Sequence, residues 1–449
     1  MAGVGSFLKM NAILPMLSLL GIIVLIVVAT TKWRLHPFLA LLVGGAVYGL
    51  INGLSVEATL SALTGGLGRT VSGIGIVIAS GCIIGMVLER TGAALVMANS
   101  ALRLVGASRS VLAMTLTGSA VSVPVFCDSG YVVLSPLARS LARRTKHSMA
   151  AFTVALSMGL YATHCLVPPT PGPVAAAGEL HADMGTVIAL GLVVSVPVIA
   201  VIWFYAVQAG RRWYIEPPAA QIVADESEVE NLPGALTAFA PILLPVGLIA
   251  ARSVTGDAGG GWLDLLGNPN VALMLGAFLA LILARKQGTE VLSDWTSEAL
   301  RSAGSIVLIT AAGGALGAVL RVTPLADQIG ILLASYDLGV FNIVLPFLVA
   351  AGLKTAQGSS TVAIVTTASL VSPLLPALGL SGSIEVALTT LAIGAGGMTV
   401  SHVNDSYFWV VTQLSGLSVG QGYRLVTIGS ALVGLTALVA VVVLRLLLA

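Results

Sequence analysis

The sequence predicts an all-α polytopic membrane protein made of two inverted repeats, and three observations support this class. First, 57% of the 449 residues are hydrophobic and 9% are charged, whereas a soluble chain has about 25% charged residues. Second, the apolar residues gather in long stretches, several with a polar break inside. Third, the two halves of the chain resemble each other. At about 20 residues per span, roughly 10 to 14 spans fit, which excludes a soluble enzyme.

The apolar stretches define the expected spans. They lie near 13–31, 37–53, 72–88, 108–123, 148–167, 184–209, 235–251, 270–284, 303–320, 338–352, 384–401 and 424–448. Lys32 and Arg34 closely follow the first run, so we interpret it as a membrane span and not as a cleaved signal peptide. The 51 glycines should let neighbouring helices approach closely.

Charge and cysteine usage exclude further classes of partner. The chain has 21 Lys and Arg against 19 Asp and Glu, a net charge of +2, which offers no surface for nucleic acid. Cys82, Cys127 and Cys165 have no Cys-x-x-Cys spacing, so neither a disulfide framework nor a zinc site is indicated. We expect no cofactor and no metal.

A polar stretch at 210–232 divides the chain near its midpoint, and we expect it to be a solvated cytoplasmic linker. The flanking halves align when the sequence is slid along itself until Arg69 meets Arg301. Over 23 positions, this alignment also pairs Ala79 with Ala311, Gly81 with Gly313, Gly85 with Gly317, Val87 with Val319, Leu88 with Leu320 and Thr91 with Thr323. We therefore expect one repeat at 1–209 and a second at 233–449.

Basic residues orient the spans, because Lys and Arg gather in cytoplasmic loops. The resulting path leaves 15 of the 21 basic residues inside, Lys354 in the membrane and five outside, namely Lys9, Arg69, Arg252, Arg321 and Arg445. It requires a re-entrant hairpin at about 108–145 that enters from inside and one at about 338–376 that enters from outside. Broken helices are expected at about 148–182 and 384–416. This pattern is typical of secondary transporters, whose sites form near the midplane where broken elements meet.

In the first repeat, the polar groups at membrane depth are a hairpin tip and a helix break. Asp128 is at the tip, where it could exchange a proton, hold a cation or cap the following helix, and Ser129 beside it is a candidate substrate ligand. His164 could shuttle a proton or be a neutral structural histidine. Thr170 lies among four prolines that forbid a regular helix, so its hydroxyl is a candidate substrate ligand.

The second repeat offers a matching pair of segments. The hairpin tip has Lys354, an amide and a run of hydroxyls before an apolar helix, which is a suitable cradle for a carboxylate. Alternatively, Lys354 could form a structural ion pair with Asp128 or Asp405. The candidate substrate ligands here are Lys354, Gln357, Ser359, Ser360, Thr361 and Asn404, and the further candidates for proton or cation coupling are His402 and Asp405.

Two other functional classes fit these residues poorly. Asp128, Ser129 and His164 are the parts of a nucleophilic triad, but no Gly-x-Ser-Gly loop aligns with a histidine helix, and no histidine pair at i and i+4 could bind zinc. A channel would need a selective ion ring, whereas these tips carry both acidic and basic groups. The chain is therefore not expected to be an enzyme.

Four segments together resemble the gluconate permease family of the ion-transporter superfamily. They are Phe126-Cys127-Asp128-Ser129-Gly130-Tyr131-Val132-Val133-Leu134-Ser135-Pro136, Thr163-His164 followed by Pro168-Pro169-Thr170-Pro171-Gly172-Pro173, Gly358-Ser359-Ser360-Thr361-Val362-Ala363, and Ser401-His402-Val403-Asn404-Asp405 with Phe408-Trp409. The likeness spans nearly the whole chain. It implies proton-coupled uptake of a sugar acid across the bacterial inner membrane. It also implies scaffold and transport domains with elevator-type movement, two opposed hairpins and a homodimer.

Three departures from the family pattern affect the expected substrate. Gluconate members often carry Glu at the position of Asp128, His at Thr170 and Arg at Lys354. Each change shortens or removes a polar reach into the site, and Lys replaces a bidentate fork with a point charge. The substrate can therefore be gluconate or another small acid such as D-glycerate, D-serine or fructuronate. The coupling ion is expected to be a proton, with sodium as the alternative.

Overall fold

The computed structural model is helical throughout the part of the chain that it describes. The described residues are 15, 17–26, 28–30, 32–105, 109–123, 125–218, 232–255, 260–325 and 339–448, and they contain no strand. Within these ranges, seven helical segments are long and apolar enough to cross a membrane. They are Val56–Arg90, Met149–Leu180, Met184–Arg212, Ala235–Arg252, Thr289–Arg321, Gly339–Gln357 and Val419–Leu448.

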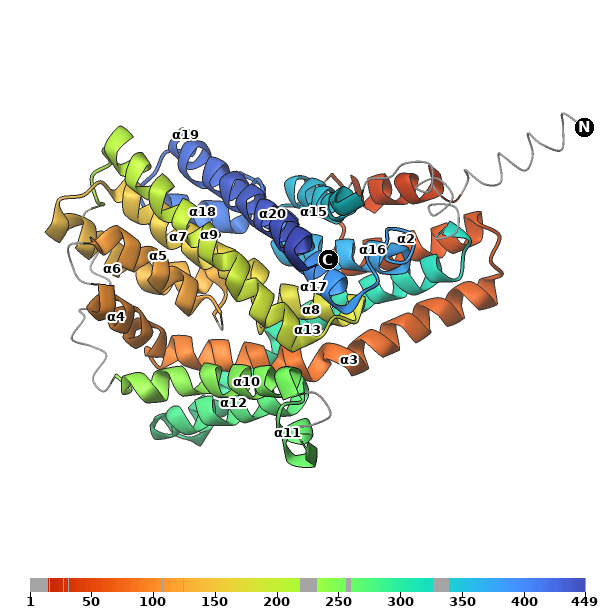
Figure 1. Cartoon of the computed structure of the whole chain (residues 1–449), viewed down its shortest axis with the longest axis horizontal. Coiled ribbons are helices and arrows are strands. Elements are labelled where there is room, and N and C mark those ends of the chain that lie inside the picture. Colours follow the sequence, from red (N-terminus) through yellow and green to blue (C-terminus); the bar gives the residue numbers. More distant parts are fainter. Residues whose placement is uncertain are drawn as a thin grey trace, which may run out of the picture.

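α2 (Pro37–Ile51), α3 (Val56–Arg90), α12 (Pro269–Leu283) and α13 (Thr289–Arg321) pack on one another, with α2 against α13 and α12 against α3 (Figure 1). α2 and α12 each begin with a proline, which suits the first helical turn because its missing N–H has no helical partner there. α3 and α13 are the long helices of this group. They cross closely at Gly66, where a Cβ atom would lie 2.6 Å from the Gly314 carbonyl oxygen.

The first half continues with short helices and a broken one. α4 (Ala93–Val105) leads to α5 (Ser110–Val121) and α6 (Cys127–Thr145), and then to α7 (Met149–Leu166) and α8 (Pro171–Leu180). α7 ends before the proline-rich segment because consecutive prolines remove N–H donors and exclude helical geometry. α8 starts at a proline for the same reason that α2 does.

The first half ends with α9 (Met184–Arg212). In the second half, α10 (Ala235–Thr255) and α11 (Gly260–Leu266) precede α12. After α13 come η4 (Gly339–Ile343), α15 (Val344–Gln357), α16 (Ser360–Val371), η5 (Ser372–Leu374), α17 (Ser383–Gly397), α18 (Ser406–Leu414), α19 (Val419–Gly422), the π-helical turn η6 (Tyr423–Thr427) and α20 (Ile428–Leu448).

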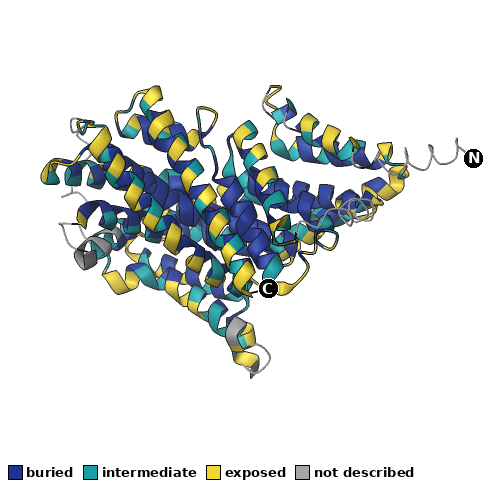
Figure 2. Cartoon of the chain, turned by 45° about the horizontal axis from the view of Figure 1, so that its top comes forward, coloured by how far each residue is buried: buried dark blue, intermediate teal, exposed yellow. Residues whose placement is uncertain are grey.

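The core lies around α7, all of whose residues are buried. Glycines let the neighbouring helix α5 approach closely: a Cβ atom at Gly159 would lie 2.6 Å from the Thr115 carbonyl oxygen, and one at Gly118 would lie 2.8 Å from that of Leu156. Figure 2 shows buried residues through the middle of the molecule and exposed residues along its edges. Many of the exposed side chains are large and apolar, among them Phe204 and Val439, as expected for a surface that contacts lipid.

Several helices extend beyond the spans that hydropathy predicts. The expected spans 72–88 and 303–320 are the second halves of α3 and α13, whose first halves carry more polar residues. α4 was not expected, because Asn, Ser and Arg interrupt its apolar residues. Part of the expected linker, 219–231, and the expected hairpin starts at 108 and 338 lie outside the described residues.

Candidate functional site

A cavity of about 260 Å³ lies where the two hairpin tips meet the two helix breaks. The tips are the segments between α5 and α6 and between α15 and α16, and the breaks separate α7 from α8 and α17 from α18. The residues that line it are Phe126, Cys127, Asp128, Tyr161, His164, Gln357, Gly358, Ser359, Ser360, Thr361, Asn404, Asp405, Ser406 and Tyr407. Segments from both halves of the chain thus share one polar pocket.

Three helices begin at this cavity. α6, α16 and α18 start at Cys127, Ser360 and Ser406, which all line it. The Ser359 hydroxyl accepts a hydrogen bond from the Val362 N–H at 3.3 Å and so caps α16. Helix starts carry partial positive charge and free N–H groups. Their convergence makes the cavity suitable for an anion.

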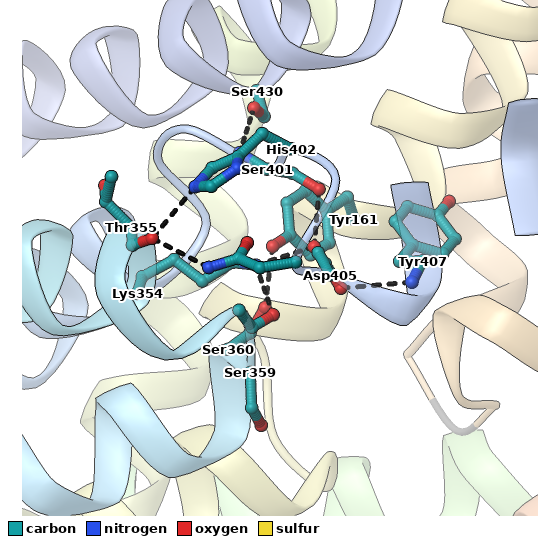
Figure 3. A network of polar contacts seen from close by, with 12 residues as sticks. Tyr161, Lys354, Thr355, Ser359, Ser360, Ser401, His402, Asp405, Tyr407 and Ser430 are labelled. Carbon is teal, nitrogen blue, oxygen red and sulfur yellow. Dashed lines mark hydrogen bonds and ion pairs between the residues drawn. The ribbon is translucent and has the colours of Figure 1, made fainter. Parts of the chain in front are cut away.

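A buried ion pair forms one wall of the site (Figure 3). The Lys354 ammonium is fully buried and lies 2.6 Å from Asp405 Oδ2. It also donates to the Gly358 carbonyl at 2.6 Å. Asp405 accepts further hydrogen bonds from the Ser401 hydroxyl and, at 3.0 Å, from the Tyr407 N–H. Each charge has several partners, which offsets the cost of burying it. Since the two residues lie on different elements, the ion pair joins the hairpin α15–α16 to the break between α17 and α18.

Three other polar side chains at the cavity have buried atoms without a hydrogen-bond partner in the described part of the chain. They are Asp128 through Oδ1, His164 through Nδ1 and Gln357 through both amide atoms. Asp128 Oδ2 accepts a weak hydrogen bond from the Cys127 thiol, at 3.7 Å. Leaving such groups unpaired costs free energy, so this set of unpaired atoms is typical of a site that binds a polar ligand.

Aromatic side chains close another side of the cavity. The Tyr161 hydroxyl lies 2.6 Å from Ser360 Oγ, and its ring centroid lies 5.2 Å from that of Tyr407. Phe126 packs against His164 with ring centroids 5.9 Å apart. Sequence reasoning missed Tyr161 as a site residue. Its position one helical turn before His164 was the available signal, because residues i and i+3 share a helix face.

His402 and Asn404 hold the second hairpin tip against the helix break. Both contact the Thr355 carbonyl oxygen at 2.9 Å, through His402 Nε2 and Asn404 Nδ2. The tip is so close here that a Cβ atom at Gly358 would lie 2.2 Å from the Asn404 carbonyl oxygen. Gly358 also has φ of 81°, a conformation that strongly favours glycine.

The structure brings most of the residues that the sequence singles out to the cavity. Those that line it are Asp128, His164, Gln357, Ser359, Ser360, Thr361, Asn404 and Asp405. Four others do not: Lys354 lies behind the wall on Asp405, and His402 contacts the hairpin backbone. The Thr170 hydroxyl donates to the Val167 carbonyl at 2.7 Å, and Ser129, next to Asp128, is not among the lining residues.

Comparison with known sequences identifies related proteins along the whole chain. Residues 14–447 match the GntP family permease profile. Relatives include an inner membrane permease, YgbN, of Escherichia coli, 33% identical over 94% of this chain and 96% of its own, and a gluconate permease of Pseudomonas aeruginosa, 32% identical over 96% and 97%. The D-serine transporter DsdX of Escherichia coli is 31% identical over 94% and 96%.

A solved structure has a similar fold. The crystal structure of the Alcanivorax borkumensis YdaH transporter superimposes with a TM-score of 0.65 at 15% identity, and covers 91% of this chain and 98% of its own. The cavity at the hairpin tips therefore belongs to a transporter fold, and the chain is a multi-pass protein of the inner membrane.

Proposed function

Because the chain belongs to the GntP family of permeases, we propose that it carries gluconate or a closely related sugar acid into the cell together with protons. The family consists of transporters and not of enzymes. The observation that supports the substrate class is the cavity at the two hairpin tips, where helix starts, hydroxyls and unpaired polar atoms surround one small space.

The substrate carboxylate binds at the start of α16. Ser359, Ser360 and Thr361 line this end of the cavity, and the first N–H groups of the helix have no helical partner. Lys354 lies behind them and keeps the region from becoming negative, because it balances Asp405. A small carboxylate gains hydrogen bonds here without displacing the ion pair.

The hydroxyls of a sugar acid bind the remaining polar groups. The Gln357 amide offers both a donor and an acceptor, and neither has a partner in the described structure. His164, which also lines the cavity, offers a third unpaired atom, Nδ1. A polyhydroxylated acid satisfies these atoms, whereas an apolar acid would leave them unpaired at a cost of about 1–3 kcal/mol each.

Asp128 takes the coupled proton. Since Lys354 and Asp405 neutralise each other, a bound carboxylate and an ionised Asp128 put two negative charges into the buried cavity. A proton on Asp128 removes one of them. Charges are costly at membrane depth, so the substrate favours the protonated site, which couples the two movements.

The movement is of the elevator type, between a transport domain and a scaffold that each contain elements of both inverted repeats. α2 and α12 are both 15 residues long, and their first residues pair under the same alignment of the two halves that places Arg69 on Arg301. α3 and α13 begin one position out of that register. The hairpins and broken helices form the transport domain, α2, α3, α12 and α13 belong to the scaffold, and the protein works as a homodimer.

The proposal is tested by uptake of labelled gluconate into proteoliposomes that contain the purified protein. A proton gradient and a sodium gradient are imposed separately, and unlabelled hydroxy acids and D-serine serve as competitors. We expect accumulation with the proton gradient alone and strongest competition from six-carbon sugar acids. Accumulation driven by sodium would overturn the proton coupling, and competition only from shorter or amino-bearing acids would overturn the substrate class.

A further inference from the structure

A second polar cavity, of about 310 Å³, lies between α3, α8 and α13. Its lining residues are Gly66, Arg69, Thr70, Gly73, Ile74, Gly178, Glu179, His181, Gly314 and Arg321. None of these residues lines the cavity at the hairpin tips. The lining contains two guanidinium groups and one carboxylate, so its formal charge is +1 without the histidine.

Among the described residues, the carboxylate forms an ion pair with Arg321, whereas Arg69 influences it only through space. Glu179 is buried, and its Oε1 lies 3.0 Å from a guanidinium nitrogen of Arg321. The Thr70 hydroxyl donates to Glu179 Oε2 at 3.4 Å. Arg69 is exposed and has no carboxylate partner among the described residues. One cation in this cavity is therefore available to an anion from solution.

Two helices connect this cavity to the one at the hairpin tips. At their starts, a Cβ atom at Gly172 of α8 would lie 4.0 Å from the Cα atom of Thr361 on α16. At their ends, the hydroxyl of Ser372, directly after α16, donates to the Glu179 carbonyl at 2.9 Å. The helices run in the same direction, and the 12 residues of α16 span about 18 Å.

The orientation from basic residues puts Arg69 and Arg321 outside, which is the side from which an imported anion arrives. Building on the proposed function, we propose that the cavity at Arg69 and Arg321 is a second binding site for small carboxylates, which captures the substrate before it reaches the hairpin tips. Arg69 attracts the anion, and the Arg321 guanidinium, which already donates to Glu179, donates to the anion as well.

The net positive charge of the cavity favours rapid, transient binding of the anion over tight binding. A cleft lined by charge of one sign raises the local concentration of the opposite ion and its association rate, by roughly 10- to 1,000-fold in documented cases. Glu179 competes for Arg321, so the anion is not held permanently. Since Arg69 is exposed, its attraction for the anion should decrease with rising salt concentration, because salt screens exposed charges.

A thiol placed in the cavity reports its charge directly. Gly73 lines the cavity, and a Cβ atom there meets nothing within 4 Å, so Gly73→Cys fits. The native thiols Cys82, Cys127 and Cys165 are buried, but Cys127 lines the cavity at the hairpin tips, so the rate measured with the unmodified protein is subtracted. The purified variant is reacted with an anionic and a cationic methanethiosulfonate reagent, with free cysteine as reference. We expect the anionic reagent to react about tenfold faster, relative to the reference.

Two arginine variants provide the matched comparison. In the Gly73→Cys background, Arg69→Gln should abolish the preference for the anionic reagent. Arg301→Gln should keep it, because Arg301 is exposed on α13, does not line the cavity and is the counterpart of Arg69 in the alignment of the two halves. Equal rates for both reagents, no reaction at all, or equal effects of the two arginine variants would overturn the proposal.

Protection by gluconate tests the carboxylate specifically. We expect gluconate to slow the modification of the Gly73→Cys thiol. It should do so also in the presence of Gln357→Ala, which weakens gluconate binding in the cavity at the hairpin tips. Loss of protection with Gln357→Ala would mean that gluconate acts only from that cavity, and would refute the second site. Uptake by the unmodified protein is measured in parallel. Absence of gluconate uptake would count against the proposed function, whereas the charge preference of the thiol reaction still tests the anion site.

Discussion

Asp405 and Asp128 line the same cavity but have opposite surroundings. Asp405 contacts the Lys354 ammonium, the Ser401 hydroxyl and the Tyr407 N–H. Asp128 has one buried oxygen with no partner in the described structure and one weak thiol contact. Several donors hold the Asp405 carboxylate in place, whereas Asp128 keeps unused acceptor capacity that faces the cavity. The comparison is the basis on which we propose a structural role for Asp405 and proton exchange for Asp128.

Removing the partner of Asp405 should have the largest effect. Lys354→Met leaves a buried, uncompensated carboxylate, which typically costs about 3–5 kcal/mol. We expect a clearly lower unfolding temperature in detergent and no gluconate uptake. The double variant Lys354→Met, Asp405→Asn should recover part of the stability because no charge is left alone. A single variant as stable and as active as the unmodified protein would show that the pair is not structural.

Loss of the Gln357 amide should affect binding more than stability. Gln357→Leu removes two atoms that have no partner in the described structure, so the unfolding temperature should stay nearly unchanged. The lost hydrogen bonds to substrate should raise KM for gluconate by roughly 5- to 30-fold, equivalent to about 1–2 kcal/mol. Gln413→Leu, at an exposed position of α18, is the control. An unchanged KM would exclude Gln357 from the substrate site.

Tyr161→Phe should have a smaller effect on the same readout. It removes the hydrogen bond of 2.6 Å to Ser360 but keeps the ring that packs on Tyr407. A neutral hydrogen bond contributes about 0.5–1.5 kcal/mol, so KM should rise by about two- to tenfold. Tyr205→Phe, which removes a hydrogen bond to the Arg424 carbonyl away from the cavity lining, should leave KM as it is. Equal KM values for both variants would argue against a positioning role of Tyr161.

Thr170→Ser should have the smallest effect. The hydroxyl is retained and can still donate to the Val167 carbonyl, and residue 170 does not line the cavity. We expect KM and the unfolding temperature to stay close to those of the unmodified protein, with KM within about twofold. A rise in KM of tenfold or more would bring Thr170 back among the substrate ligands.

The sequence predicts the class of fold because an apolar stretch of about 18 residues or more has few alternatives to a membrane helix. It predicts both helix breaks because prolines and clustered polar residues cannot continue a helix in lipid. The first halves of α3 and α13 are harder to predict, since their mixed composition is stabilised by packing between the two helices. Hydropathy does not predict α4, because polar residues interrupt its apolar ones as well.

The candidate site is predictable as a set of segments but not as a set of contacts. Asp128, Gln357 and Ser360 stand out because polar residues at membrane depth usually have a function. The pairing of Lys354 with Asp405, 51 residues apart, depends on how the hairpin meets the second helix break, and local patterns do not determine this. For the same reason the sequence shows Thr170 as a free hydroxyl, although the backbone next to it accepts its hydrogen bond.

The central claim is that Asp128 carries the coupled proton, and Asp128→Asn tests it most directly. Proteoliposomes with this variant are assayed for gluconate accumulation under a proton gradient and for exchange of labelled against unlabelled gluconate without a gradient. Asp264→Asn, which removes an exposed carboxylate near Arg252, is the control. We expect Asp128→Asn to lose gradient-driven accumulation while exchange persists. Accumulation at the level of the control would contradict the account.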